Sequence, residues 1–222
     1  MRQRKRRKIL NVGNVLIKSP TQLDGIRKSG EINTAILDYV SSHIRAGVST
    51  EEIDRWVRTE TKRMGAKAAP LNFEGFPKSV CTSLNSVICH GIPKEEEILK
   101  EGDIINVDVS TIYDGYYSDA SRMFCIGEVS ADKKRLVQVA KEAIQVGLME
   151  VKPFLPIGNM GHAIHMYIQS QGYSVVEEIG GHGVGLEFHE DPWVSYTAPR
   201  GSGEILLPGM VFTIEPMINM GS

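Results

Sequence analysis

Two aspartates, Asp108 and Asp119, occupy a stretch that otherwise has the pattern of a β-hairpin. In residues 104–110 apolar and polar side chains alternate, which places Asp108 on the polar face of a strand. Asp114-Gly115 favours a two-residue turn, because both positions of such a turn need a positive φ. This register pairs Asp119 with Ser110, so the two carboxylates become diagonal neighbours on one face, about 7–8 Å apart.

Two carboxylates that point into the same space need a cation between them, or they hold one proton in common. The alternative is an edge hairpin that carries two solvated acids. Further along the chain, His182 lies among glycines, which permit close backbone approach. Glu215 lies in the apolar run 210–217 and shares a face with Thr213.

The elements that must position these residues follow one order twice: two helices, then short strands. Helices are predicted from Ser19-Pro20 to Gly47, from a capping box at 49–52 to Gly65, from Ser130 through Leu148, and from Pro156 to Gly172. Short strands are predicted at 80–84, 86–90, 175–179 and 210–217. The order indicates an internal duplication in which helices cover one face of an antiparallel sheet and leave its polar face as the site.

Length and composition exclude several classes of protein. The 222 residues allow one large domain or two small ones. No apolar run approaches the length of a membrane span, and the first residues carry no secretory apolar region. The three cysteines, Cys81, Cys89 and Cys125, have no CxxC spacing, which argues against a disulfide framework or a zinc ribbon. We therefore expect a cytoplasmic protein.

The charge distribution is uneven along the chain. Residues 2–8 contain six basic side chains and no acid, whereas the remainder carries 19 basic against 27 acidic side chains. We expect residues 1–12 to form a basic, disordered arm and residues 13–222 to form the catalytic domain. A solvated arm is the simpler interpretation. The alternative is an electrostatic tether to an anionic partner such as ribosomal RNA, held by phosphate contacts that salt would weaken.

Five separated motifs together resemble those of type I methionine aminopeptidases, and they occur in that family's order. They are His90-Gly91-Ile92-Pro93, Asp108 with Asp119, Gly181-His182-Gly183-Val184-Gly185, Phe188-His189-Glu190-Asp191-Pro192, and Phe212-Thr213-Ile214-Glu215-Pro216-Met217. The resemblance runs from about Thr21 to the last residue. It implies the α+β pita-bread fold: two pseudo-symmetric αβ halves, with helices backing a curved antiparallel sheet, and a dinuclear metal centre between the halves.

The resemblance also implies an activity, the removal of methionine from nascent polypeptide N-termini when the second residue is small. Its implied metal ligands are Asp108, Asp119, His182 and Glu215. Its implied catalytic residues are His90 and His189, which contact the scissile amide and its oxyanion, with a carboxylate such as Glu215 passing the proton to the leaving amine. The implied pocket for the methionine side chain contains Phe73, Phe76, Cys81, Phe188 and Met217, beside His90. We expect two divalent ions (Co, Mn, Fe or Zn), a monomer, and no membrane partner.

One departure from the family concerns the C-terminal end. The family has a fifth ligand, a glutamate on a strand well beyond the Glu215 motif, and Ser222 ends the sequence before that position. We therefore expect a C-terminally shortened form without the last strands and with impaired metal binding. Two alternatives stay open: an Xaa-Pro peptidase of the same fold, which usually has a large N-terminal domain, and a non-catalytic pita-bread scaffold that binds peptides, histones or RNA. Such scaffolds lose ligands by substitution, whereas all four are present here.

Overall fold

A computed structural model describes residues 10–221. The helices are α1 (Pro20–His43), α2 (Thr50–Arg63), α3 (Ala131–Glu150) and α4 (Gly158–Ser170), with a short 3-10 turn η1 (Phe73–Gly75). The strands are β1 (Leu10–Val12), β2 (Val15–Ile17), β3 (Lys67–Ala68), β4 (Cys81–Leu84), β5 (Ile104–Tyr113), β6 (Tyr116–Cys125), β7 (Ser174–Val175), β8 (Gly181–Gly183), β9 (Glu190–Val194) and β10 (Ile218–Asn219). The predicted arm 1–12 lies outside the described residues except at 10–12, where the chain forms β1.

Side-chain caps explain where three of the helices begin. Ser19 precedes α1, and its hydroxyl and the side chain of Gln22 satisfy each other's backbone N–H groups, which completes a capping box. The hydroxyl of Ser49 accepts the N–H of Glu52 at the start of α2, as the sequence predicts. Ser130 caps α3 in the same way. Local hydrogen bonding therefore fixes the entry points of these helices before any tertiary packing.

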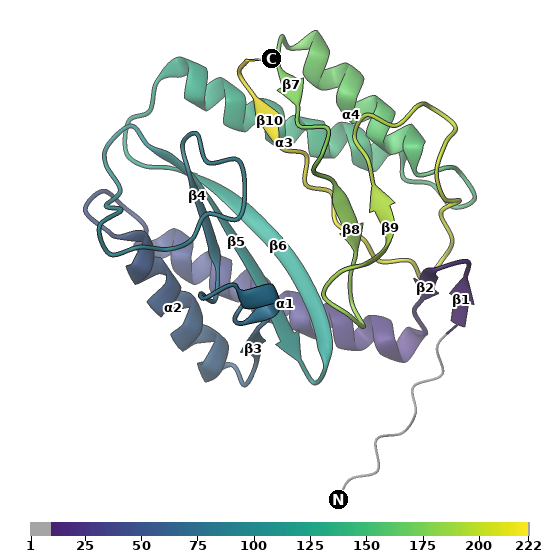
Figure 1. The fold of residues 1–222 in the computed structure, drawn as a ribbon, viewed down its shortest axis with the longest axis horizontal. Coiled ribbons are helices and arrows are strands. Elements are labelled where there is room, and N and C mark those ends of the chain that lie inside the picture. Colours follow the sequence, from purple (N-terminus) through teal and green to yellow (C-terminus); the bar gives the residue numbers. More distant parts are fainter. Residues whose placement is uncertain (1–9, 222) are drawn as a thin grey trace, which may run out of the picture.

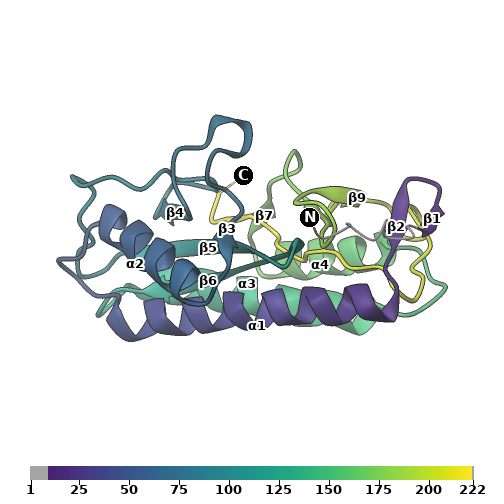
Figure 2. The ribbon, with the colours of Figure 1, turned by 90° about the horizontal axis from the view of Figure 1, so that it is seen from below.

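The central sheet of the first half is antiparallel and carries the helices on one side. β5 pairs with β6 along one edge and with β4 and β3 along the other. In Figure 2 the long helix α1 runs beneath the β5–β6 hairpin, while the loops around β4 rise on the opposite side. One face of the sheet is thus covered by helix, as predicted, and the other stays open to carry the site.

Each half of the molecule has its own hydrophobic core. The first core lies among α1, α2 and β4–β6, and includes Ile36, Ile53 and Val107, all fully buried. The second lies among α3, α4 and the segments that follow them, and includes Met160 and Ile164. Figure 1 shows the two units side by side, with α1 and α2 on one side and α3 and α4 on the other. This arrangement confirms the predicted division into two αβ halves.

Two predicted strands are wrong. Residues 86–90 form a loop, because Asn85 adopts a positive φ of 49° and turns the chain out of β4. The apolar Val87 and Ile88 that suggested a strand are 41% and 46% exposed. Residues 210–217 run beside β8, which is three residues long, but they form only one isolated bridge, between Phe212 and Gly183. The strand predicted at 175–179 is wrong beyond its first residue, because β7 ends at Val175.

Among the described residues, no helix has the length and apolar character needed to cross a membrane.

Candidate metal centre

The β5–β6 hairpin places two aspartates on the open face of the sheet. Its tip is Asp114-Gly115, with φ values of 49° and 76°, and its ladder pairs Ser110 with Asp119 and Asp108 with Ser121. This register confirms the one that the turn residues predict, and it makes Asp108 and Asp119 diagonal neighbours. The Ser110 hydroxyl donates to Asp119 Oδ1 at 3.0 Å, which orients that carboxylate.

The second half supplies His182 and Glu215 to the same place. His182 is the central residue of β8, and its Nε2 lies 3.4 Å from Asp119 Oδ2 and 3.5 Å from Glu215 Oε1. The backbone around Glu215 is held against β8 by the N–H of Thr213, which donates to the carbonyl of His182 at 2.8 Å. Three residues that are far apart in the sequence therefore meet between the two halves.

The electrostatics of this cluster favour the neutral forms of Asp108 and Glu215. Burial, followed by the charges of Asp119 and Glu215, raises the pKa of Asp108 well above its usual value. Burial and Asp119 raise the pKa of Glu215 to about 7, although Thr213 and His182 act in the opposite direction. Burial lowers the pKa of His182, but its bonds to Asp119 and Gly183 and the charge of Glu215 outweigh burial and leave that pKa raised.

The donor set fits a divalent cation. Three carboxylates and one imidazole are hard and borderline ligands, suited to manganese, iron, cobalt or zinc. The carbonyl of Gly183 lies 2.9 Å from Nδ1 of His182, so it can accept that N–H and leave Nε2 turned toward the carboxylates. Within the described part of the chain, no three His, Cys, Asp or Glu side chains are arranged to hold a metal. The four predicted ligands contact one another instead, so binding would require these contacts to be exchanged for metal bonds.

Aromatic rings line one side of this cluster. Phe188 stacks on His189 with ring centroids 4.3 Å apart, and His189 stands edge-on to His182 at 4.4 Å. Phe73 approaches both Phe188 and His189, at 4.9 and 5.2 Å. Tyr117 on β6 completes this aromatic cluster by stacking on Phe188. Burial and the neighbouring His182 lower the pKa of His189, which favours its neutral form.

The remaining predicted site residues differ in burial and in their distance from the carboxylates. Cys81 is buried on β4 directly opposite Asp108, and burial together with Asp108 raises the pKa of its thiol. His90 has a positive φ of 54° in the exposed loop after β4, and its charge is close enough to lower the pKa of His189. Met217 is half-buried, and its carbonyl accepts the N–H of Val176.

The ring of Phe76 takes no part in the ring contacts among residues 10–221. Phe76 closes the η1 turn through its backbone, because its N–H donates to the carbonyl of Phe73 and its own carbonyl accepts from Asn72. The structure therefore brings Phe73 and Phe188 together, as predicted, and leaves Phe76 outside the aromatic cluster.

Sequence reasoning missed two residues that hold the ligands in place. The hydroxyl of Tyr196, which is 1% exposed, accepts the N–H of Glu215 at 2.5 Å. The backbone N–H of Tyr117 donates to Gly185 at 2.8 Å and joins the hairpin to the glycine-rich segment. Tyr117 lies two residues before Asp119 on the predicted hairpin, so a role near the site could have been proposed for it from the sequence. Nothing in the local sequence connects Tyr196 to Glu215.

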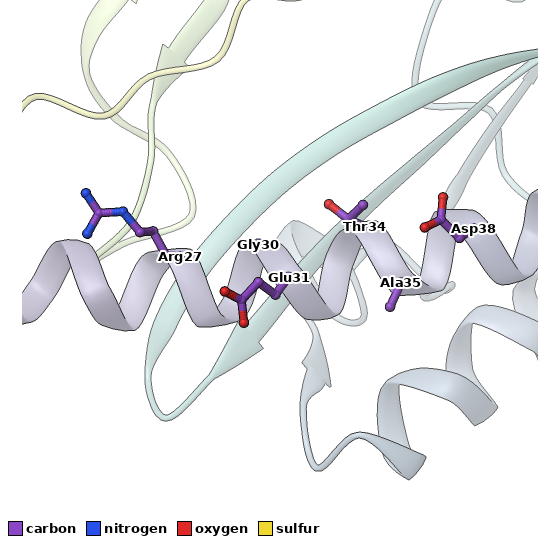
Figure 3. Close-up of a pocket in the computed structure, with 6 residues that line it drawn as sticks. All are labelled: Arg27, Gly30, Glu31, Thr34, Ala35 and Asp38. Carbon is purple, nitrogen blue, oxygen red and sulfur yellow. The ribbon is translucent and has the colours of Figure 1, made fainter.

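A shallow hollow on the outer side of α1 is separate from this centre. It is lined by Arg27, Gly30, Glu31, Thr34, Ala35 and Asp38. Figure 3 shows these side chains along one helix, with none of the predicted ligands among them. Asp38 is paired there with Arg122 at 2.9 Å. The hollow therefore belongs to the surface of the helix that covers the sheet, and it contains none of the residues of the candidate metal centre.

The fold and the meeting of three partly buried carboxylates with one imidazole are typical of a metal-dependent enzyme built from two αβ halves. The model of metallopeptidase family M24 matches residues 24–221, and the chain belongs to that family. Methionine aminopeptidase A of Synechocystis is 44% identical over 208 residues, which cover 94% of this chain and 82% of the relative. The crystal structure of methionine aminopeptidase from Rickettsia prowazekii matches with a TM-score of 0.91 at 40% identity, covering 94% of this chain and 84% of that one.

A more distant structure shares the architecture. An Xaa-Pro dipeptidase from Bacillus anthracis matches with a TM-score of 0.77 at 27% identity, covering 90% of this chain but 54% of that one. The chain is thus more similar to the methionine aminopeptidases in identity, TM-score and shared length. Membership of a metallopeptidase family agrees with the donor set of the site and with the pita-bread fold.

Proposed function

We propose that this protein is a methionyl aminopeptidase, a metal-dependent exopeptidase that removes the N-terminal methionine from nascent proteins when the second residue is small. The observation that carries the proposal is the meeting of Asp119, His182 and Glu215 beside the aromatic cluster. Family membership and the 44% identity to methionine aminopeptidase A of Synechocystis support it. Neither the Xaa-Pro peptidase nor the non-catalytic scaffold is favoured by these observations.

We infer that the site holds two divalent cations, chosen among manganese, iron, cobalt and zinc. Asp108, Asp119, His182 and Glu215 would be their ligands. When bound, such cations would supply Lewis-acid chemistry: they would polarise the scissile carbonyl, lower the pKa of a water and coordinate the neutral α-amine of the substrate. The carboxylates are suited to this role because their mutual repulsion is relieved by positive charge.

The protein's own side chains would perform the remaining steps. Glu215 would take up a proton and pass it to the leaving amine, because its carboxylate lies at the centre of the cluster beside His182. His189, whose pKa is lowered, stays neutral and can donate one N–H toward the oxygen on which negative charge develops. His90, in the loop after β4, would contact the scissile amide. Phe73 and Phe188 provide an apolar surface for a flexible thioether side chain and exclude water from it.

The experiment that tests this proposal compares substrates on metal-reconstituted protein. The chain is loaded anaerobically with each of the four metals and assayed on Met-Ala-Ser, Leu-Ala-Ser and Ala-Pro-Ala. We expect hydrolysis of Met-Ala-Ser alone. Cleavage of the Xaa-Pro peptide would instead identify the other enzyme branch. Metal binding without any turnover would agree either with the non-catalytic scaffold or with the impairment expected from a site of four ligands, and Asp108→Asn serves as the ligand-deficient control.

We also propose that the protein works as a monomer in the cytosol, where nascent N-termini become accessible. The basic residues at 2–8 are suited to an electrostatic tether to ribosomal RNA. Ribosome sedimentation at increasing salt concentration tests the tether, with residues 2–8 deleted as the control. Association that survives either the deletion or high salt would contradict it.

A further inference from the structure

We propose that Lys18 is a positioning residue: its buried ion pair with Glu190 fixes the loop Gly185–Glu190 so that Phe188 and His189 face the metal centre. The inference rests on the proposed function, because it concerns how that reaction's second histidine is held. Lys18 lies just before α1 in the first half, whereas Glu190 opens β9 in the second half. The sequence motifs single out Phe188 and His189 and assign no role to Lys18.

The ion pair is one of the most enclosed charged contacts of the protein. Nζ of Lys18 lies 2.5 Å from Oε2 of Glu190, and the two side chains are 0% and 2% exposed. The other oxygen of the carboxylate, Oε1, accepts the backbone N–H groups of Leu186 at 2.6 Å and Glu187 at 2.8 Å. Glu190 therefore closes the loop on itself. Lys18 neutralises the carboxylate that does so, since an unpaired charge at such a site would be strongly unfavourable.

Lys18 also contacts the other end of this loop. Gly185 has a φ of 137°, and a Cβ added there would lie 3.4 Å from Cε of Lys18 and 2.4 Å from Cδ1 of Ile26. The stem of Lys18 thus passes the first residue of the loop while its ammonium group reaches the last. The carbonyl of Gly185 accepts the N–H of Tyr117, which ties the same end to the hairpin that carries Asp119.

The backbone of Lys18 is itself fixed. Its N–H donates to the carbonyl of Gly209 at 2.8 Å, and a Cβ at Gly209 would lie 2.8 Å from the carbonyl oxygen of Lys18. The next residue is Ser19, the cap of α1. The backbone of Lys18 is therefore rigidly held, and its ammonium group in turn fixes the position of the loop Gly185–Glu190. Phe188 and His189 lie within the loop Gly185–Glu190, and the ring of His189 contacts both Phe188 and His182.

The test is Lys18→Met, which keeps an unbranched apolar stem and removes the charge. On metal-loaded enzyme with Met-Ala-Ser, we expect kcat to fall by about 10- to 100-fold, the range that follows from small misplacements of catalytic groups. Metal affinity by calorimetry should stay at the wild-type value, because the predicted ligands lie outside the loop. Hydrogen exchange of the Leu186 and Glu187 amides should become faster, and that readout does not depend on turnover.

Three further variants make the outcome decisive. Val57→Ala lowers stability within the first core, away from the loop, and should leave kcat unchanged at temperatures well below unfolding. Arg55→Met removes an exposed ion pair with Glu95 and is the matched charge control. If Lys18→Met does not fold, the double variant Lys18→Met/Glu190→Gln leaves no unpaired buried charge and keeps an oxygen acceptor for the two amides.

The proposal is overturned if Lys18→Met, or the double variant, keeps wild-type kcat and wild-type amide protection. It is also overturned if kcat falls only in proportion to metal affinity, or if Val57→Ala lowers kcat equally, since both results describe a general loss of structure. A wild-type protein that does not cleave Met-Ala-Ser would refute the proposed function, and the exchange of the loop amides would then still decide the role of Lys18.

Discussion

At Glu215 the fold places a carboxylate in surroundings that favour its protonated form. Its side chain is 28% exposed, and burial and Asp119 are the two causes that raise its pKa from 4.5 to about 7. The hydroxyl of Thr213 donates to it at 2.5 Å and His182 lies beside it, and both reduce the effect without cancelling it. A residue held in this way at a site that must bind cations implies that stability and metal binding respond to pH in opposite directions.

For the metal-free protein we predict that stability falls as pH rises through the range set by Glu215. A carboxyl group whose pKa is higher in the folded state binds more protons than in the unfolded chain, so raising the pH from 4.5 to about 7 favours unfolding. The difference in pKa corresponds to at most about 3 kcal/mol. The raised pKa values of Asp108 and His182 act in the same direction. Urea unfolding in the presence of a chelator, at pH 5 and pH 7.5, measures the change.

Glu215→Gln isolates this residue's share of the pH dependence. The variant cannot ionise at that position, so its unfolding free energy should depend less on pH than that of the wild type. At pH 7.5 the variant should therefore be more stable than the wild type. Asp38→Asn, at an exposed ion pair on α1, is the control and should leave the slope unchanged. Equal slopes for wild type and Glu215→Gln would show that Glu215 titrates normally in the folded protein.

At the scale of elements, the β5–β6 hairpin could be predicted in full because its signals are local. The Asp114-Gly115 tip selects the turn, and alternation selects the face, so the register of ten residue pairs follows. Residues 86–90 also have an apolar local pattern but form a loop. The chain turns at Asn85, which has a positive φ, and the composition of residues 86–90 does not predict this turn. Local reasoning succeeds where one turn fixes the pairing and fails where the partner strand is distant.

The segment that carries Glu215 also shows that a local pattern does not determine strand pairing. Its alternation correctly places Thr213 and Glu215 on one face, and yet it forms a single bridge to β8 in place of a ladder. Two side-chain contacts add to its few backbone bonds: the Thr213 hydroxyl accepts the N–H of His182 at 2.9 Å, and the Tyr196 hydroxyl accepts the N–H of Glu215. Such long-range contacts depend on the packing of the second core, which sequence patterns do not specify.

We therefore predict that Tyr196→Phe weakens both folding and metal binding. The substitution keeps the ring in the second core but leaves the backbone N–H of Glu215 without its acceptor, a loss of about 1–3 kcal/mol for a buried group. Urea unfolding measures the stability, and calorimetry with manganese or cobalt measures the affinity. Tyr167→Phe is the control, because its hydroxyl donates to Glu142 between α4 and α3 and has no bond to the Glu215 segment. A Tyr196→Phe protein with unchanged unfolding and metal affinity would mean that the Glu215 segment is held by other contacts.

At the scale of the whole molecule, the predicted metal site lies across the boundary between two separately packed halves. Asp108 and Asp119 belong to the sheet of the first half, and His182 and Glu215 belong to the second. Another link across this boundary is the bond from the N–H of Tyr117 to the carbonyl of Gly185. Ligands drawn from both halves mean that a bound cation would resist their separation as well as serve the reaction.

Metal binding should therefore raise the thermal stability of the entire protein. A ligand present at about 100 times its dissociation constant stabilises the folded state by about 2.7 kcal/mol, and about 1 kcal/mol raises Tm by about 2–4 °C at this size. We predict a rise in Tm of about 5–10 °C on adding manganese or cobalt to chelator-treated protein, measured by circular dichroism. Asp119→Asn should lose most of the rise, because Asp119 contacts the second half directly through His182. Asp38→Asn should keep it. A rise that Asp119→Asn retains in full would place the stabilising cation elsewhere than between the halves.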